Sequence, residues 1–175
     1  MTRAILTLLA FIAPVVALES QSKLPAFMSG DRLEPTLVTP HLEAGAVSEV
    51  RVGADGRATL VVLVKPKPRM HIYSADVDGY MPFTLTMQPQ RDMSVGKVAY
   101  PSSELYVFAP TGESSRAYMK PFKVTVPLAF GAESRARTEG RTSGTPGVVT
   151  LRYQACDDAV CYRPTSGSFV FEIIR

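Results

Sequence analysis

The sequence predicts an all-β protein, an antiparallel β-sandwich with an immunoglobulin-like architecture. No segment beyond the N-terminal stretch shows the sustained apolar periodicity of an amphipathic helix. The apolar segments are short, rich in β-branched and aromatic residues, and bounded by Gly, Pro and Asp. Short strands without interleaved helices favour a sandwich, although the Cys–Trp–Cys spacing of antibody domains is absent.

We expect strands where this pattern is strongest, namely at Val47–Val52, Ala58–Val64, Met70–Tyr73, Phe83–Met87, Lys97–Tyr100, Phe122–Leu128, Val148–Ala155 and Ser168–Ile173. The sequence Ala54-Asp55-Gly56 predicts a hairpin turn between the first two strands, because Asp-Gly tolerates the positive φ that tight hairpins need. Residues 18–40 are expected to form an irregular arm, and Gly131–Gly147 a long mobile loop inside one domain whose core spans about residues 33–174.

Composition excludes several classes of protein. The chain has 175 residues, 46% hydrophobic and 20% charged, which fits one globular domain and excludes intrinsic disorder. A net charge of +3, without a basic patch interleaved with aromatics, predicts no nucleic-acid partner. The two histidines, His41 and His71, are too few for a multi-histidine metal site, and we expect no bound metal or organic cofactor.

The N-terminus resembles a secretory signal peptide. Arg3 is followed by an almost wholly apolar segment that ends in small residues, which predicts cleavage after Ala17 and a mature chain of residues 18–175. The apolar segment is shorter than the ~20 residues of a membrane-spanning helix, and Pro14 would kink it. The alternative is a leader retained as a membrane anchor. The leader predicts an exported protein, and outside the cytosol a cysteine pair can persist as a disulfide.

The candidate chemistry is in the two cysteines, Cys156 and Cys161. Strand alternation turns the apolar residues from Val149 to Ala155 toward the core, which predicts that Cys156 lies on the outer, accessible face. A hairpin at Asp157–Val160 would then place the two cysteines opposite each other, close enough for a local disulfide.

Three chemistries are open to this pair: thiol–disulfide exchange, which we favour, a structural bridge, and metal binding. In the chain-entropy model a disulfide that closes a six-residue loop stabilises the fold by about 2.2 kcal/mol, against roughly 4.7 kcal/mol for a hundred-residue loop. A local bridge therefore contributes comparatively little stability. A Cu(I) site involving Met70, His71 and Met81 is the metal alternative. The carboxylates next to Cys156 should raise the pKa of a free thiol by like-charge repulsion.

The segment from Tyr153 to Pro164, Y-Q-A-C-D-D-A-V-C-Y-R-P, resembles the signature of the N-terminal periplasmic domain of the thiol:disulfide interchange protein DsbD. Weaker similarities extend over about residues 33–174. The resemblance implies an immunoglobulin-like fold that passes reducing equivalents from a membrane electron carrier or thioredoxin-like domain to exported thiol proteins, as a component of a protein-disulfide reductase. It implies that Cys161 forms the mixed disulfide and that Cys156 resolves it. The motif-flanking residues are Tyr153, Gln154, Asp157, Asp158, Tyr162 and Pro164.

The family also shields its cysteines with a cap loop, which by order in the chain should be Glu104–Gly112. Tyr106 and Phe108 are the candidate shields, with ordinary core packing as the alternative for both rings. The spacer between the cysteines is four residues here, where the resemblance leads us to expect five. No electron-transfer or thioredoxin-like segment follows in this sequence, so we expect a stand-alone module that depends on a separate donor.

The alternative function is a non-catalytic sandwich module with a structural disulfide. Such a module would bind a partner as an adaptor, in copper delivery or cytochrome maturation.

Overall fold

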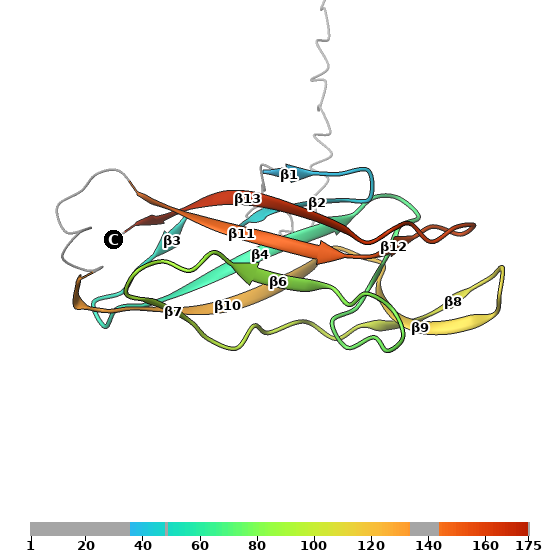
Figure 1. Ribbon diagram of the computed structural model, residues 1–175, viewed down its shortest axis with the longest axis horizontal. Helices are drawn as coiled ribbons and strands as arrows, with labels where there is room; N and C mark the ends of the chain where they lie inside the picture. The colour runs from blue at the N-terminus through green and yellow to red at the C-terminus, as the bar shows by residue number, and fades with distance from the viewer. Residues whose placement is uncertain (1–35, 48, 134–143, 175) are drawn as a thin grey trace, which may run out of the picture. The chain divides into compact units, whose positions relative to one another are not determined.

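The computed structural model describes residues 36–47, 49–133 and 144–174, and these form strands of three sheets (Figure 1). The predicted signal peptide and most of the predicted irregular arm lie outside the described residues, as does the middle of the predicted 131–147 loop. In the part of the chain that is described, no helix is long and apolar enough to cross a membrane.

The first sheet, sheet A, contains five strands, each antiparallel to its neighbour. In spatial order they are β1 (Leu37–Val38), β2 (Leu42–Ala46), β4 (Arg57–Pro66), β10 (Phe122–Phe130) and β7 (Met93–Val95). The second sheet, sheet B, is ordered β3 (Val50–Arg51), β13 (Thr165–Ile174), β11 (Thr145–Tyr153) and β6 (Thr84–Met87). Its pairs are antiparallel except β13–β3, which is parallel.

Sheets A and B enclose one apolar core. Buried and exposed residues alternate along β10, β11 and β13, so that each strand turns one apolar face inward. The inward residues of β4, among them Leu60, Val62 and Val64, join Val149 and Leu151 of β11 in one cluster. Each such fully buried side chain contributes about 1.5–3 kcal/mol relative to exposure. The predicted all-β, immunoglobulin-like sandwich is therefore confirmed.

A third sheet, sheet C, carries the cysteine region. It is ordered β12 (Ala155–Cys156), β5 (His71–Tyr73), β9 (Glu113–Tyr118) and β8 (Glu104–Phe108), with antiparallel pairs throughout. In Figure 1 these strands lie at the right-hand end. β11 and β12 are separated only by Gln154, so the chain passes directly from sheet B into sheet C.

Two expectations about the connections are corrected. The turn before β4 forms, with Gly56 at φ 78° and its amide donating to the Gly53 carbonyl at 2.9 Å. It does not close a hairpin, however, because β3 belongs to sheet B and β4 to sheet A. Part of the expected irregular arm and the residues just after it are also ordered strands, because β1 and β2 add to the edge of β4.

The expected strand at Lys97–Tyr100 reduces to an isolated bridge between Ala99 and Thr125. β7 pairs Val95 with Leu128, so between this pair and the bridge the three residues 96–98 oppose the two residues 126–127 of β10, which is a bulge. Pro127 lies at the bulge, where its carbonyl accepts from the Gly96 amide. Because proline has no N–H to return a hydrogen bond, the regular ladder is interrupted there.

The core predicts the cost of truncation. Leu151 is 0% exposed, so Leu151→Ala should lower the free energy of unfolding by about 2–5 kcal/mol, through lost transfer energy and a residual cavity. Val170 is 54% exposed on the outer face of the same sheet, and Val170→Thr should change the free energy by about 0.5 kcal/mol or less. Urea unfolding of both variants measures this, and equal effects would contradict the assignment of the core face.

Candidate functional site

Cys156 and Cys161 form a disulfide at the edge of sheet C. Their Cα atoms are 4.0 Å apart and the two residues form an antiparallel bridge. The hairpin between them is closed by backbone hydrogen bonds from the Asp157 amide to the Val160 carbonyl at 2.9 Å and from the Tyr162 amide to the Ala155 carbonyl at 2.8 Å. The structure therefore brings the pair together in a local hairpin.

The two cysteines differ in exposure. Cys161 is exposed, whereas Cys156 is only 1% exposed, so the expectation that Cys156 lies on the outer face is wrong. The reason is the passage between sheets at Gln154, where strand alternation is interrupted and both Ala155 and Cys156 become buried. Of the two cysteines, only Cys161 is therefore exposed at the surface.

Tyr73 lies against both sulfur atoms. Its hydroxyl oxygen is 3.4 Å from Cys156 Sγ and 3.5 Å from Cys161 Sγ, and because disulfide sulfurs carry no hydrogen, the hydroxyl is the donor. The ring stacks on Tyr80 with centroids 4.2 Å apart, and the Tyr80 hydroxyl donates to Glu113 Oε2 at 2.8 Å. Burial, together with Tyr80 and Glu113, raises the pKa of Tyr73 to about 12, so the hydroxyl keeps its proton at neutral pH.

His71 and Tyr106 cover the other side of the hairpin. Their rings stack with centroids 3.8 Å apart, and the Tyr106 hydroxyl donates to the Asp157 carbonyl at 3.4 Å. His71 pairs with Cys156 across the strands, and Asp158 Oδ1 lies 3.4 Å from His71 Nε2 without hydrogen-bond geometry. Burial lowers the pKa of His71, against the opposing effect of Asp158 and Asp157.

The segment expected to be a cap loop is instead strand β8 and the turn to β9. Tyr106 faces the cysteine hairpin, as described above. Phe108 lies at the end of β8, where its carbonyl accepts from the Gly112 amide at 2.8 Å. Within the described ranges, no side-chain hydrogen bond or ring stacking joins Phe108 to the cysteine hairpin.

Asp157 stabilises the hairpin turn through its carboxylate. Oδ1 accepts the amides of Ala159 and Val160, both at 2.8 Å, and Oδ2 accepts the Tyr162 hydroxyl at 2.7 Å. These bonds, with that of Tyr162 the largest effect, lower the pKa of Asp157 to about 2. Asp158 is exposed and faces His71. The two neighbouring carboxylates therefore have different surroundings.

The remaining motif residues, Tyr153, Gln154 and Pro164, flank the cysteine hairpin in the sequence. Tyr153 is buried, and its hydroxyl is 2.8 Å from Thr39 Oγ1. The Gln154 side chain accepts from the Met81 amide at 3.3 Å and donates to the Tyr162 carbonyl at 3.2 Å. Pro164 is exposed beyond the second cysteine.

Sequence reasoning did not assign site roles to Tyr73, Tyr80 or Glu113. Tyr73 is 83 positions from Cys156, so no local spacing indicates their contact. The one available signal is strand alternation, which places His71 and Tyr73 on the same face of β5.

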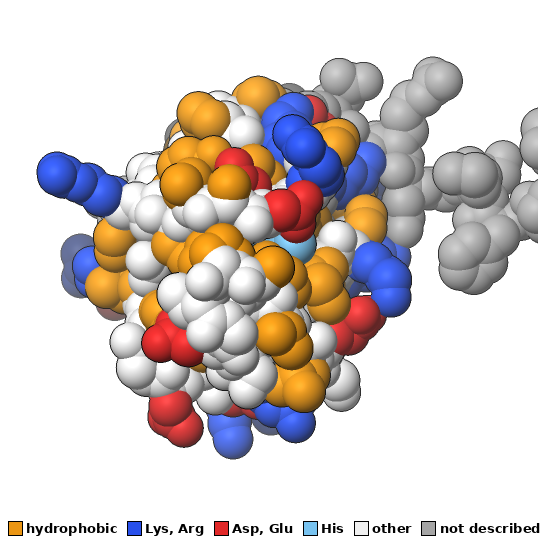
Figure 2. All heavy atoms as spheres, turned by 90° about the vertical axis from the view of Figure 1, so that its right-hand side faces the viewer, with side chains coloured by type: hydrophobic (Ala, Val, Ile, Leu, Met, Phe, Trp, Pro, Cys, Tyr) orange, Lys and Arg blue, Asp and Glu red, His pale blue; other side chains and the backbone are white. Residues whose placement is uncertain are grey.

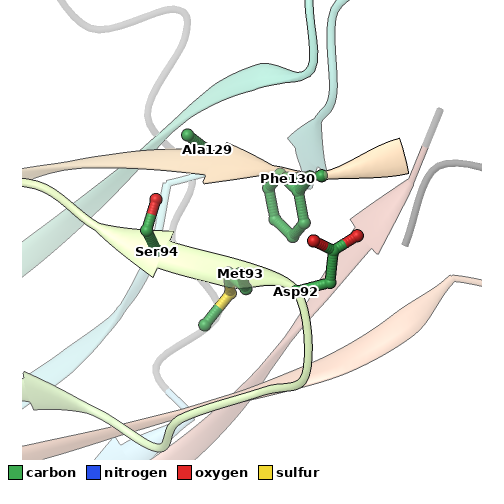
Figure 3. A pocket seen from close by; sticks show the side chains of 6 residues that line it. Asp92, Met93, Ser94, Ala129 and Phe130 are labelled. Atoms are coloured by element: carbon green, nitrogen blue, oxygen red, sulfur yellow. The ribbon is translucent and has the colours of Figure 1, made fainter. Parts of the chain in front are cut away.

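No group of three or more His, Cys, Asp or Glu side chains is gathered for a metal ion within residues 36–47, 49–133 and 144–174. A Cu(I) site built on methionine sulfur is a different donor set, and it stays a prediction. A separate hollow of about 420 Å³ lies between β7 and β10 (Figure 3). Figure 3 shows Met93 and Ser94 pointing to opposite sides of β7, and Asp92 supplies the carboxylate of the lining.

The family model described as thiol:disulfide interchange protein DsbD, N-terminal, matches residues 39–172. Among curated proteins no match was found. The N-terminal periplasmic domain of ScsB from Proteus mirabilis is similar in fold, with a TM-score of 0.54 and 17% identity over 78% of this chain and 49% of that one. The chain thus spans about half the length of that structure. The reduced DsbD N-terminal domain of Neisseria meningitidis has a TM-score of 0.46 and 18% identity over 78% of this chain and 90% of that one.

The Asp157 contacts predict a titration effect. Tyr162→Phe removes the hydroxyl that contributes most to lowering the pKa of Asp157, so this pKa should rise from about 2 toward its ordinary 3.8. Because the folded pKa is depressed, the contact stabilises the fold above pH 3.8, and this stability is lost as the pH falls toward 2. NMR titration of the Asp157 carboxyl measures the shift, and an unchanged pKa would contradict the assigned contact.

Proposed function

Because the chain belongs to the family of the N-terminal domain of the thiol:disulfide interchange protein DsbD, we propose that it exchanges disulfides with protein thiols through Cys156 and Cys161. The observation that carries this proposal is the unequal exposure of the two cysteines. Cys161 is exposed and Cys156 is 1% exposed, so an incoming thiolate has one sulfur to attack and one to displace.

The exchange proceeds in two balanced steps. A partner thiolate attacks Cys161 Sγ, forming a mixed disulfide, and the Cys156–Cys161 bond breaks with Cys156 leaving as a thiolate that takes up a proton. A second partner thiolate then attacks the partner sulfur of the mixed disulfide, which releases Cys161. The partner dithiol is oxidised to a disulfide and the Cys156–Cys161 pair is reduced to a dithiol. The reverse sequence carries electrons out of the pair.

Tyr73 assists the breaking bond. Its hydroxyl donor is 3.4 Å from Cys156 Sγ, the atom that gains negative charge as the disulfide opens. A hydrogen bond to a charged group is worth roughly 1.5–3 kcal/mol, more than one to a neutral atom. The tyrosine therefore favours the leaving thiolate over the intact disulfide.

A purely structural role is disfavoured by what the bridge connects. Both cysteines belong to one hairpin at the edge of sheet C, so the bond does not link sheets A and B of the sandwich. The hairpin is already closed by backbone hydrogen bonds and by the Asp157 carboxylate. The bridge thus adds little that these contacts do not supply.

We infer the partners and the compartment from the family to which the chain belongs. The donor is a thioredoxin-like domain or membrane electron carrier, and the acceptors are exported thiol proteins in the periplasm. Figure 2 views the molecule from the β8–β9–β12 end, where hydrophobic side chains, white atoms and a few acidic side chains occupy the centre and Lys and Arg lie mostly toward the rim. Tyr106, rather than Phe108, is the ring that shields the hairpin until a partner docks.

The unequal roles of the cysteines are tested by trapping. Cys156→Ser should accumulate a mixed disulfide between Cys161 and a thioredoxin whose own resolving cysteine is replaced by serine, because neither protein then has a second thiol to release it. Cys161→Ser should give none, because Cys156 is buried. Non-reducing electrophoresis with mass spectrometry identifies the linked residue. Trapping at Cys156, or with neither variant, would show that the proposed roles are wrong.

The reduction potential separates exchange from a structural bridge. An exchanging pair should have a potential less negative than about −300 mV, whereas structural disulfides typically lie below that value. Equilibration of the full chain with glutathione buffers, followed by quantifying the two redox forms, measures it. A pair that resists reduction at every glutathione ratio would support the adaptor alternative.

A further inference from the structure

His71 is a polar side chain whose ring nitrogens are both buried in the disulfide form. Among the residues that the structure describes, neither nitrogen has a hydrogen-bond partner. Stacking on Tyr106 accounts for the position of the ring but not for its nitrogens. Because buried polar atoms are nearly always paired in folded proteins, a partner in another state of the protein is expected.

The register supplies that partner. His71 and Cys156 are directly opposed in the antiparallel β5–β12 pair, and opposed side chains share a face with Cβ atoms about 4.5–5.5 Å apart. In the disulfide, Cys156 Sγ has no hydrogen to donate. Reduction gives it an S–H group, which is a donor for an imidazole nitrogen.

We propose that His71 is the proton acceptor of Cys156, so that the reduced pair reacts through a Cys156 thiolate. This deepens the proposed exchange function and rests on it. When Cys161 is held in a mixed disulfide, the Cys156 proton passes to a ring nitrogen of His71. The Cys156 thiolate then attacks Cys161 Sγ, the bond between Cys161 and the partner breaks, and the partner sulfur leaves as a thiolate. The imidazolium returns the proton to that thiolate through solvent, while the pair is oxidised and the partner sulfur reduced.

The electrostatics around His71 suit this role. The titratable groups near it are Asp157 and Asp158 after β12, Tyr106 on β8, Cys156 opposite it on β12, and Tyr73 on the same face of β5. Burial lowers the pKa of His71, which leaves the ring neutral at neutral pH but also makes it a weaker base, and Asp158 and Asp157 oppose this effect. Asp158 Oδ1, 3.4 Å from Nε2, then stabilises the imidazolium.

A thiol titration tests the inference without an exchange assay. In the full chain with Cys161→Ser, Cys156 is the one thiol, because the sequence has 2 Cys. The ultraviolet absorbance of the thiolate gives its pKa with and without His71→Phe, which keeps a ring to stack on Tyr106 but removes both nitrogens. We expect His71→Phe to raise the pKa of Cys156 by about one unit, which is about tenfold less thiolate at neutral pH.

Two carboxylate variants serve as a matched pair. Asp158→Asn should change the pKa of Cys156 by less than His71→Phe does, because it removes a group that stabilises the imidazolium and, at the same time, a carboxylate that repels the thiolate. Glu172→Gln, an exposed carboxylate of β13 in sheet B, should leave this pKa unchanged. Circular dichroism checks that each variant is folded.

The resolving step gives a second readout. With thionitrobenzoate attached to Cys161 of the chain that retains both cysteines, the rate of its displacement by Cys156 is recorded against pH. We expect the midpoint of this profile to lie about one pH unit higher in His71→Phe. An unchanged Cys156 pKa together with an unchanged profile overturns the role of His71. Displacement of thionitrobenzoate without any exchange with protein thiols would instead contradict the proposed function.

Discussion

At Gln154 the chain changes from one sheet to another, and the position of both sulfur atoms follows from this change. A backbone that leaves a sheet in the interior must satisfy its polar groups elsewhere. Here the Gln154 carbonyl accepts the Tyr73 amide at 3.1 Å, so β5 takes over as pairing partner. The Gln154 side chain accepts a hydrogen bond from the Met81 amide and donates one to the Tyr162 carbonyl, which fixes the chain where it changes sheet. This change of sheet causes the burial of Cys156, and therefore the difference in exposure between the two cysteines.

That difference gives each sulfur a distinct environment within one hairpin. Cys161 is exposed, whereas Cys156 lies between Tyr73, whose hydroxyl is 3.4 Å away, and His71, its opposed neighbour. Burial by itself disfavours a thiolate. The hydroxyl donor and the imidazole offset this cost on the buried side, where water is excluded and both interactions are stronger than at the surface. The arrangement therefore favours charge on the sulfur that a partner does not touch.

The parts of the site that the sequence predicted are those set by local chemistry. The cysteine hairpin follows from four intervening residues and an Asp157 whose carboxylate caps its own turn. The sandwich follows from alternation along strands such as β10. Tyr73 was not assigned to the site, because its contact with Cys156 spans 83 positions and depends on how sheet C assembles. The burial of Cys156 was predicted wrongly for the same reason, since extending the alternation of β11 ignores the change of sheet at Gln154.

The contact of the Tyr106 side chain with the cysteine hairpin is weak enough to be reversible. Tyr106 makes one ring stack on His71 and one hydroxyl bond of 3.4 Å to the Asp157 carbonyl. An aromatic pair contributes about 0.5–1.5 kcal/mol and a typical hydrogen bond about 0.5–1.5 kcal/mol, so parting them costs on the order of 1–3 kcal/mol. This is well below the 5–15 kcal/mol that stabilises an ordinary domain. Displacing Tyr106 would therefore uncover His71 while the two-sheet core stays folded, which links the docking of a partner at the hairpin with hydration of the imidazole opposite Cys156.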